Sequence, residues 1–341
     1  MERDCLMIPE LLTDLVTIPG QSGHESRIRN YLCSKFRDYG AIELDRLGSV
    51  IYHIPGTKDS AKKKRIMISA HMDTCGFIVH SVQSSGMVKV VSFGYSDVNA
   101  CHLQLVGIQT PTKIILGLLH ASKSGEESSF EIDIGTPTEL KFISPGDPVH
   151  FLNNPYLLGD PSENIICSPR LDNRIGIFEL LLLANQLASH PPSHDIYLVG
   201  SVEEEVGARG AKTAAQTIKP DIAIVLDATY HVYPVEIGKG PVITLSDKAV
   251  ILPTQIRDYL LELAKSHSIA LQTEVWNIGA TDATTIRTVE QGVPTIPILT
   301  SIKNAHTPGE IACITDCYEV VNYIKVLIEE IEAIAELFEK F

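Results

Sequence analysis

The sequence is poor in basic residues and has no long apolar run. It holds 28 Lys and Arg against 42 Asp and Glu, which gives a net charge of −14. A charge of that sign repels phosphate backbones, so nucleic acid is not expected as a partner. The densest apolar stretch, 177–188, is too short to cross a membrane and contains Glu179, Asn185 and Gln186. Membrane insertion is therefore not expected either.

The first residues lack the features of a secretory signal. Glu2 and Asp4 are acidic where such a signal needs a basic region followed by an unbroken apolar stretch, so the cytoplasm is the expected compartment. The seven cysteines are odd in number and form no CxxC pair, which indicates reduced thiols rather than a disulfide or Cys-based zinc framework. A GxSxG element is also absent, which argues against a serine nucleophile.

What is present is typical of a globular α/β protein. Hydrophobic residues make up 44% and charged residues 21% of the 341 residues, a length that suggests about two domains. Beyond Arg170, helical and strand patterns alternate, which predicts a mostly parallel sheet flanked by helices. The predicted helices span 173–189, 208–217, 254–267, 282–290 and 316–338, and the predicted strands span 196–202, 222–226, 271–276 and 295–299.

The N-terminal part begins with a helix signal. Ser22 and Glu25 have the spacing of a capping box, which predicts a helix that starts there and ends near Tyr39. Two β-rich runs follow, at 50–54 and 65–70.

The middle of the chain has a different pattern of strand and turn residues. From 77 to 163, short strand-like pieces lie between Gly, Pro and Ser turns, and no helical period appears. We therefore predict one α/β domain built from residues 1–76 and 164–341, interrupted by a small all-β, barrel-like domain at 77–163.

Residue types that bind metal ions stand just after the carboxyl ends of four predicted strands. They are His71 and Asp73, the three glutamates Glu203, Glu204 and Glu205, then Asp227 and, after a short loop, His306. In open α/β sheets the carboxyl ends of the strands form the ligand crevice, so these side chains can converge in space.

Each of these residues also has a purely structural interpretation. A His-x-Asp pair is more often hydrogen-bonded than metal-bound, and three consecutive glutamates usually form a solvated face. Asp172 and Asp227 fit helix caps or turns, and His306 fits a loop. Together, however, two imidazoles and three carboxylates form a ligand set for two divalent ions with one carboxylate bridging them. A neighbouring glutamate that binds no metal suits the base that takes a proton from water.

Six stretches of the chain, taken in order, carry a family resemblance. They are Ala70-His71-Met72-Asp73-Thr74-Cys75-Gly76-Phe77, Leu171-Asp172-Asn173-Arg174-Ile175-Gly176, Val202-Glu203-Glu204-Glu205-Val206-Gly207-Ala208-Arg209-Gly210-Ala211, Asp227, Gly279-Ala280-Thr281-Asp282-Ala283 and Ala305-His306-Thr307-Pro308. These stretches resemble the co-catalytic aminopeptidases of metallopeptidase family forty-two. That family includes glutamyl and deblocking aminopeptidases and tetrahedral self-compartmentalising peptidases. The likeness covers nearly the whole chain.

The resemblance implies two divalent metal ions per chain. One would be held by His71 and Asp227 and the other by Glu205 and His306, with Asp172 bridging them. Zn²⁺ and Co²⁺ are the expected ions, and Mn²⁺ also fits these ligands. Family members further imply a strained or cis peptide after Asp172.

The resemblance also implies the catalytic roles. Glu204 would be the general acid/base, and Asp73 would accept a hydrogen bond from His71 and fix its tautomer. The sequence departs from the family at two places. Thr74-Cys75 stands where many relatives carry Glu-Ile, and Asn173 stands where many carry a second Asp.

The implied reaction removes N-terminal residues from short peptides by means of a hydroxide that bridges the two ions. A homo-oligomer is implied as well, for example a dodecamer, with the 77–163 domain at oligomer contacts and at the route of substrate access. Two other functions stay open. One is a zinc amidohydrolase or deacylase that acts on N-acyl substrates, and the other is a catalytically silent, oligomeric metal-binding scaffold.

Overall fold

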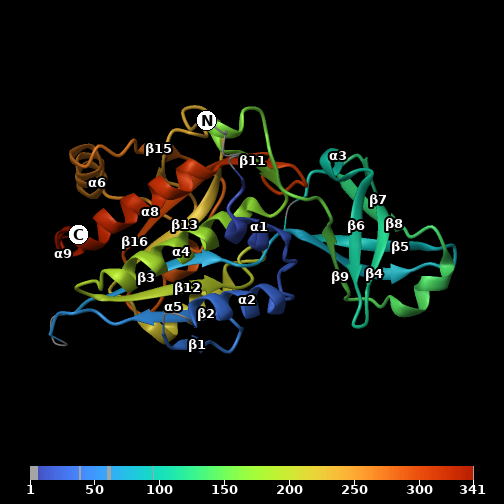
Figure 1. Cartoon of the computed structure of the whole chain (residues 1–341), viewed down its shortest axis with the longest axis horizontal. Helices are drawn as coiled ribbons and strands as arrows, with labels where there is room; N and C mark the ends of the chain where they lie inside the picture. Colours follow the sequence, from blue (N-terminus) through green and yellow to red (C-terminus); the bar gives the residue numbers. More distant parts are fainter. Residues whose placement is uncertain (1–6, 38–39, 60–62, 95, 341) are drawn as a thin grey trace, which may run out of the picture.

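The computed structural model describes residues 7–37, 40–59, 63–94 and 96–340. It has two parts, which Figure 1 shows side by side: a wide sheet flanked by helices on the left and a small closed barrel on the right. The predicted α/β fold with an additional small β unit is confirmed. Among the described residues, no helix is both long and apolar enough to span a membrane.

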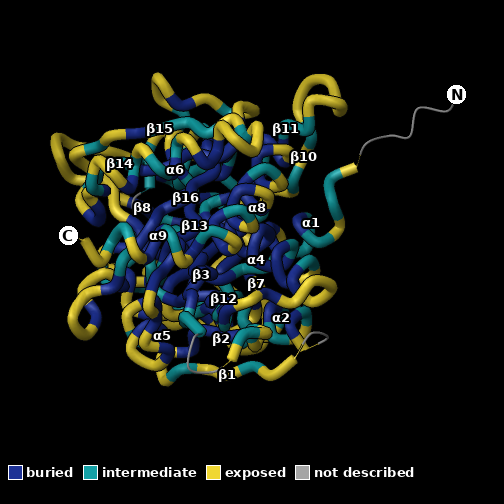
Figure 2. The backbone as a smooth tube through the Cα atoms, turned by 90° about the vertical axis from the view of Figure 1, so that its left-hand side faces the viewer, coloured by how far each residue is buried: buried dark blue, intermediate teal, exposed yellow. Residues whose placement is uncertain are grey.

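The centre of the large sheet is parallel. Its strands are β12 (Asp195–Ser201), β3 (Arg65–His71), β13 (Ile222–Tyr230) and β16 (Thr295–Lys303), in that order. Nearly every residue of these strands is buried, as expected for parallel strands with helices on both faces. Figure 2 shows them as the dark blue interior of the domain. Because the four strands are parallel, their carboxyl ends meet at one edge.

Antiparallel strands extend both sides of this centre. β2 (Val50–Ile54) and β1 (Ile42–Leu44) follow β12 on one side. On the other side, β16 is followed by β17 (Glu310–Cys313), β11 (Ile165–Ser168) and β10 (Tyr156–Leu157). β14 (Val242–Ser246) pairs with β16 in the antiparallel direction and with β15 (Gln272–Val275) in the parallel direction.

The helices around the sheet are α1 (Glu10–Thr17), α2 (Ser26–Phe36), α4 (Leu171–Ser189), α5 (Arg209–Ile218), α6 (Thr254–Ser266), α7 (Ala283–Ile286), α8 (Ile314–Glu329) and α9 (Ile331–Phe338). Helix α4 contains the densest apolar stretch of the sequence, and it is buried on nearly all sides. It packs against β3 and β13 on one side and against α1 and α8 on the other. Its apolar character therefore reflects a central position in the core.

Three predicted helix boundaries were wrong. α2 begins at Ser26, because Glu25 accepts from the main-chain N–H of Gly23 and Ser22 bonds elsewhere. Its predicted end near Tyr39 lies outside the described residues. The helix predicted at 282–290 has only one turn, 283–286, and the one predicted at 316–338 is two helices divided at Glu330.

The barrel closes in the order β4 (Gly76–Val82), β5 (Met87–Phe93), β8 (Glu127–Asp133), β7 (Ile114–Ser124), β6 (Gln104–Gln109) and β9 (Pro148–Phe151). Short helices lie beside it and after it: α3 (Val98–Cys101), η2 (Pro137–Phe142) and η3 (Pro161–Glu163). It has a hydrophobic core of its own, separate from the core of the large sheet. The closed sheet runs from 76 to 151, and the chain then returns to the large sheet through β10. The domain limits at 77 and 163 stay a prediction.

One buried arginine joins the two parts. Nε of Arg170 donates to the main-chain oxygen of Val16, 2.6 Å away, and Nη1 donates to the main-chain oxygen of Phe151 at 2.9 Å. Val16 lies in α1 and Phe151 ends the barrel. This link lies two residues before Asp172, so it fixes the chain where α4 begins.

Candidate metal centre

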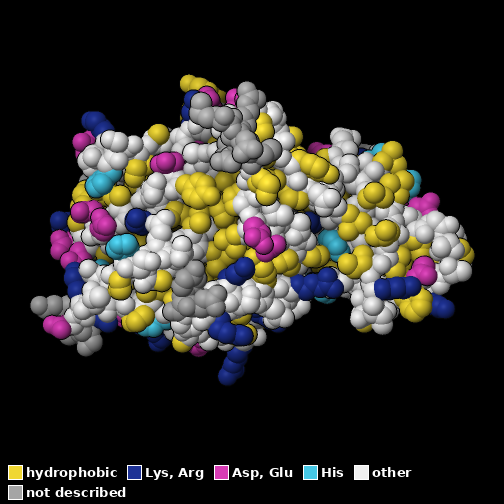
Figure 3. All heavy atoms as spheres, in the orientation of Figure 1, with side chains coloured by type: hydrophobic (Ala, Val, Ile, Leu, Met, Phe, Trp, Pro, Cys, Tyr) yellow, Lys and Arg dark blue, Asp and Glu magenta, His cyan; other side chains and the backbone are white. Residues whose placement is uncertain are grey.

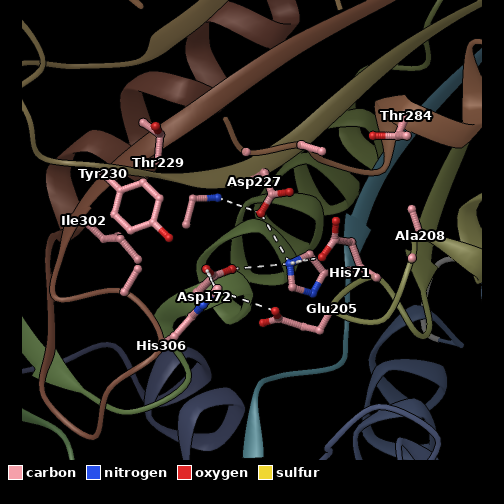
Figure 4. Close-up of a pocket in the computed structure, with 16 residues that line it drawn as sticks. His71, Asp172, Glu205, Ala208, Asp227, Thr229, Tyr230, Thr284, Ile302 and His306 are labelled. Atoms are coloured by element: carbon pink, nitrogen blue, oxygen red, sulfur yellow. Dashed lines mark hydrogen bonds and ion pairs between the residues drawn. The ribbon is translucent and has the colours of Figure 1, made fainter. Parts of the chain in front are cut away.

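The predicted site residues gather where the four parallel strands end (Figure 4). His71 is the last residue of β3, and Asp227 lies in the next strand, β13. Glu204 and Glu205 follow the end of β12, and His306 lies in the loop after β16. Residues far apart in the sequence therefore share one cavity because their strands are parallel neighbours.

Asp172 lies between the two histidines. It belongs to the first turn of α4 but has non-helical angles, with φ −80° and ψ 109°. Its Oδ1 is 3.3 Å from Nε2 of His71, and its Oδ2 is 3.1 Å from Nε2 of His306. Each oxygen of the carboxylate thus faces a different histidine, which is the arrangement of a bridging ligand.

Each histidine has a second carboxylate beside it. Nε2 of His71 is 3.3 Å from Oδ1 of Asp227, and Nε2 of His306 is 3.6 Å from Oε2 of Glu205. In each of two trios, the ligand atoms lie within 4.8 Å of one another. We call His71, Asp172 and Asp227 the His71 group, and Cys75, Glu205 and His306 the His306 group.

Asp73 orients residues of both groups. Nδ1 of His71 lies 3.0 Å from the main-chain oxygen of Asp73 and 3.5 Å from its Oδ1. Since a carbonyl oxygen only accepts, Nδ1 carries a proton. Burial lowers the pKa of His71, but Asp227, Asp172 and Asp73 raise it well above the usual value, so Nε2 is protonated as well and would release that proton to bind an ion. The carboxylate of Asp73 accepts from the hydroxyl of Ser22 at 2.7 Å and from the main-chain N–H groups of Glu204 and Glu205 at 2.9 and 3.2 Å. It therefore also holds the loop after β12.

The three consecutive glutamates point in different directions. Glu203 pairs with Arg209, with Oε2 and Nη1 2.9 Å apart. Glu205 joins the His306 group. The Oε2 of Glu204 lies 3.9 Å from Nε2 of His71, outside both groups but in the same cavity. One glutamate is thus left beside the proposed ligands without being one of them.

Sequence reasoning missed Glu310, the first residue of β17. This carboxylate is 2% exposed. Its Oε2 accepts from the main-chain N–H of Asp172 at 3.0 Å, and its Oε1 accepts from that of His306 at 2.8 Å. Glu310 thus ties the start of α4 to the loop that carries His306. The only signal in the sequence was an acid directly before an apolar strand.

Asn173, where the sequence departs from the family, has a structural role. The peptide bond between Asp172 and Asn173 is cis, as the family resemblance implied. Nδ2 of Asn173 donates to the main-chain oxygen of Leu226 at 2.9 Å, and Oδ1 accepts from the main-chain N–H of Gly176 at 3.0 Å. Asn173 therefore connects α4 to β13 directly before Asp227. A Cβ at position 176 would collide with Oδ1 of Asn173, which explains the glycine.

Cys75, at the other departure, is half-buried beside Glu205. Burial raises the pKa of its thiol well above the usual value, and the carboxylates of Glu205, Asp172 and Glu310 raise it further. Gly94, directly after β5 of the barrel, packs against this pair. A Cβ at position 94 would collide with Sγ of Cys75 and would lie 3.2 Å from Oε2 of Glu205. The barrel thus contributes to the wall of the site.

Burying several carboxyl groups together changes their pKa values. Burial raises the pKa of Glu205 to about 7 and that of Asp227 to about 6, and it raises the pKa of Glu204 well above the usual value. For Asp172, burial acts in the same direction, but hydrogen bonds from both histidines bring its pKa below the usual value. Burial would lower the pKa of His306, yet Asp172 and Glu205 raise it to about 10. Protons bound to these groups therefore balance the negative charge of the clustered carboxylates.

The residues present fit divalent cations. Oε1 of Glu205 is buried and has no hydrogen-bond partner among the described residues, and such an oxygen costs roughly 1–3 kcal/mol. A cation would remove that cost. Imidazole nitrogen and carboxylate oxygen are the donors that Zn²⁺, Co²⁺ and Mn²⁺ accept. Both groups border a cavity of about 420 Å³, in which Figure 4 shows Tyr230 and Ile302 on one side and Ala208 and Thr284 on the other.

Solved structures share this fold. A TET aminopeptidase from a marine sediment archaeon, Thaumarchaeota archaeon SCGC AB-539-E09, has a TM-score of 0.90 at 24% identity and covers 96% of this chain and 99% of that one. The Pyrococcus horikoshii TET1 peptidase has a TM-score of 0.82 at 25% identity, over 94% of this chain and 98% of that one. The description of that peptidase says that it can assemble into a tetrahedron or a large octahedral shell.

Sequence comparison identifies the family. The chain is 32% identical to a protein of Acetivibrio thermocellus, over 94% of this chain and 98% of that protein. It is 29% identical to the lysyl aminopeptidase of Pyrococcus furiosus, over 95% of this chain and 97% of that enzyme. The family described as M42 glutamyl aminopeptidase matches residues 48–322. The chain therefore belongs to the M42 aminopeptidase family and is an enzyme of the hydrolase class.

Proposed function

We propose that this chain is a two-metal aminopeptidase that removes N-terminal residues from short peptides. The observation that carries the proposal is the position of Asp172, whose two oxygens lie 3.3 and 3.1 Å from Nε2 of His71 and of His306. His71 and Asp227 would hold one ion, and Glu205 and His306 the other, with Asp172 shared. Zn²⁺ or Co²⁺ suits this set of nitrogen and oxygen donors, and Mn²⁺ is the third choice.

The chemistry needs a base beside the metal ligands. When bound, two divalent ions lower the pKa of water toward neutrality and polarise the carbonyl of the substrate. Glu204 would take the proton of the attacking water and return it to the leaving amine. Burial among carboxylates raises the pKa of Glu204, which suits a group that must hold a proton between two steps. Asp73 keeps Nε2 of His71 available and keeps Glu204 in place.

The charge of the cavity favours a free substrate amine. In this scheme Glu204 is a buried carboxylate that binds no ion, and a substrate amine can donate a hydrogen bond to it. An N-acyl group offers only one amide N–H and adds an acceptor to a site already rich in acceptors. The cavity therefore favours an aminopeptidase over a deacylase.

The test removes and restores the metal. The protein is stripped with a chelator, reloaded separately with Zn²⁺, Co²⁺ and Mn²⁺, and assayed on free and N-acetylated aminoacyl anilides, with bound metal measured by elemental analysis. We expect two ions per chain and hydrolysis of the free-amine substrates only. Faster hydrolysis of N-acetylated substrates would support the deacylase instead. Binding of metal without hydrolysis of either kind would support the scaffold.

We also propose that the barrel mediates assembly into a homo-oligomer, for example a dodecamer. Leu105, Ile114 and Leu116 are 61%, 41% and 62% exposed on neighbouring strands β6 and β7. Figure 3 shows apolar side chains gathered over this part of the barrel. Exposed apolar patches of this kind mark contact surfaces. The mass of the particle in solution, measured by light scattering, tests the proposal: Leu116→Glu should shift it toward the monomer.

A further inference from the structure

A second, smaller cavity lies beside the metal cavity. Its volume is about 180 Å³, close to the roughly 150 Å³ of a cavity that encloses one benzene molecule. It can therefore hold one amino-acid side chain. The two cavities share part of their lining, namely Ala228, Thr229, Tyr230, Gly279 and Ala280. The shared lining begins directly after Asp227, so a substrate bound at the His71 group has this cavity within reach.

Two carboxylates line this second cavity. Glu274, on β15, is 5% exposed. Its two oxygens accept from the hydroxyls of Thr229 and Thr244, each at 2.6 Å. Hydroxyl donors on both oxygens hold the carboxylate in one position and leave a further lone pair on each oxygen.

The other carboxylate belongs to Asp247, in the turn after β14. Its Oδ1 accepts from the main-chain N–H groups of Ala249 and Val250, at 2.7 and 2.6 Å. The turn therefore fixes this carboxylate as the two threonines fix Glu274.

The rest of the lining is apolar. It includes Trp276, Ile278 and Leu299, and no Lys or Arg is among the described residues that line the cavity. The ring of Trp276 contacts that of Tyr230, with centroids 6.2 Å apart. A cavity with apolar walls and two fixed carboxylates matches a side chain with an apolar stem and a cationic tip. An acidic side chain would be repelled, and an apolar one would cover the carboxylates without donating to them.

We propose that this cavity receives the side chain of the N-terminal residue of the substrate and selects Lys and Arg. The inference rests on the proposed function, because it requires the substrate amine to lie at the His71 group. Glu274 and Asp247 are then the residues that determine specificity. The apolar walls contact the methylene groups of the substrate side chain, and the carboxylates accept hydrogen bonds from its charged end.

Binding can be measured without catalysis. Trp276 is the single tryptophan of the chain, so intrinsic tryptophan fluorescence reports on this cavity alone. The metal-loaded Glu204→Gln variant, which we expect to keep both ions without hydrolysing amides, is titrated with L-lysinamide, L-leucinamide and the α-amide of L-glutamic acid. We expect saturation with lysinamide at a concentration at least about tenfold lower than with the other two, the scale of one hydrogen bond to a charged group. Equal affinity for all three amides would overturn the inference.

Two isosteric variants and a control test whether Glu274 and Asp247 bind the cationic side chain. Glu274→Gln and Asp247→Asn each remove the negative charge. Asn keeps one oxygen for both main-chain donors to Oδ1 of Asp247, whereas Gln keeps an acceptor for one threonine and offers an amide N–H to the hydroxyl of the other. Each should weaken lysinamide binding about tenfold or more and leave leucinamide binding within about twofold. Glu262→Gln is the matched control, since Glu262 is 72% exposed on α6 and pairs only with Lys265 among the described residues. If Glu274→Gln fails to fold, Asp247→Asn carries the test. Unchanged lysinamide binding in Asp247→Asn would contradict the role of that carboxylate.

Kinetics on lysyl, arginyl, leucyl and glutamyl anilides separate the inference from the proposed function. The expected result is the highest kcat/KM with the lysyl and arginyl substrates. Hydrolysis that prefers leucyl or glutamyl substrates would overturn the specificity and leave the aminopeptidase intact. Selective lysinamide binding without hydrolysis of any anilide would support the cavity and refute the aminopeptidase.

Discussion

The two halves of the candidate site have different supports. In the His71 group, the histidine is 2% exposed at the end of a central strand, and its ring is fixed by Asp73. In the His306 group, the histidine lies in a loop with a left-handed φ of 63°, and its side chain is 18% exposed. The main-chain N–H of His306 donates to the buried carboxylate of Glu310, and bonds from Asn304 to Gly309 and from Thr307 to Asn304 close the loop on itself. The sheet thus positions the histidine of one half, whereas the hydrogen bonds of a loop position the histidine of the other.

This difference predicts unequal affinities for the two ions. A ligand fixed by the strands around it needs little reorganisation to bind, whereas a ligand on a loop must be ordered first. We therefore expect the ion at the His71 group to bind more tightly.

Removing the shared ligand should have the largest effect. Asp172→Ala takes one ligand from each half, so we expect both ions to be lost and hydrolysis to become undetectable. Elemental analysis after gel filtration measures the metal content. Asp258→Ala is the control, because Asp258 is an exposed acid on α6 that pairs with Arg257. Retention of both ions by Asp172→Ala would contradict the bridging role.

Changing the proposed base should affect neither half. Glu204→Gln keeps the size of the side chain but removes the proton acceptor, so kcat should fall by at least about a hundredfold while both ions stay bound. Steady-state kinetics and metal analysis on the same sample check this. Its neighbour provides the control: Glu203→Gln disturbs only the pair with Arg209 and should keep normal turnover. Loss of metal from Glu204→Gln would instead make Glu204 a ligand.

Weakening the support of one half should separate the two ions. Glu310→Gln leaves one acceptor for two main-chain donors, those of His306 and of the shared Asp172. We expect the affinity of both ions to fall, that of the ion at the His306 group by roughly 10–100-fold and that of the other ion by less, because His71 keeps its place at the end of β3. Calorimetric titration of the stripped protein with Zn²⁺ resolves the two steps. Equal weakening of both ions by Glu310→Gln would contradict the distinction between the halves.

The pH dependence of stability should show the smallest effect. Asp227 and Glu205 have pKa values of about 6 and about 7 in the fold against ordinary values of 3.8 and 4.5, so the folded protein holds protons that the unfolded chain has released. Their contribution to stability is therefore lost as the pH rises from about 4 to 7. The raised pKa of His306, about 10 against 6.5, has the same sign at higher pH.

We therefore expect the metal-free protein to have a lower Tm at pH 8 than at pH 5.5, by a few degrees. Loading with Zn²⁺ should reduce the difference, because the ions replace protons on the ligands. Glu179 and Glu25, whose pKa values burial raises to about 8 and about 7, keep part of it. Thermal denaturation with and without chelator measures both. A metal-free Tm that rises between pH 5.5 and 8 would contradict the raised pKa values.

Local patterns in the sequence predicted the fold and much of the site. Apolar strand runs that stop at His71, Glu203 and Asp227 mark the same edge, because parallel strands share a direction. The role of Glu310 was not predicted. It depends on the pairing of β17 with β16 and β11, and no short segment of the sequence reveals that pairing. The capping box failed for a related reason: Ser22 donates to a carboxylate 51 residues away rather than to its own helix.

The same limit applies to the second cavity. Glu274 and Asp247 are separated by helix α6, and in the sequence each is an ordinary polar residue of a strand or turn. Their side chains meet one cavity only because β14 and β15 pair in parallel. The proposed selectivity of this cavity therefore depends on tertiary contacts, which the periodicity of hydrophobic residues in the sequence does not reveal.

The contact between Gly94 and the pair Cys75 and Glu205 bears on how this enzyme could be engineered. We expect a version without the barrel to lose activity, because excision would cut the chain four residues after His71 and remove the wall that Gly94 forms beside Cys75 and Glu205. Grafting a barrel from a relative onto this scaffold would require a glycine at the point of contact, because Gly94 has a φ of 74° and a Cβ there would collide with Cys75 and lie 3.2 Å from Glu205. The barrel is therefore not an interchangeable module.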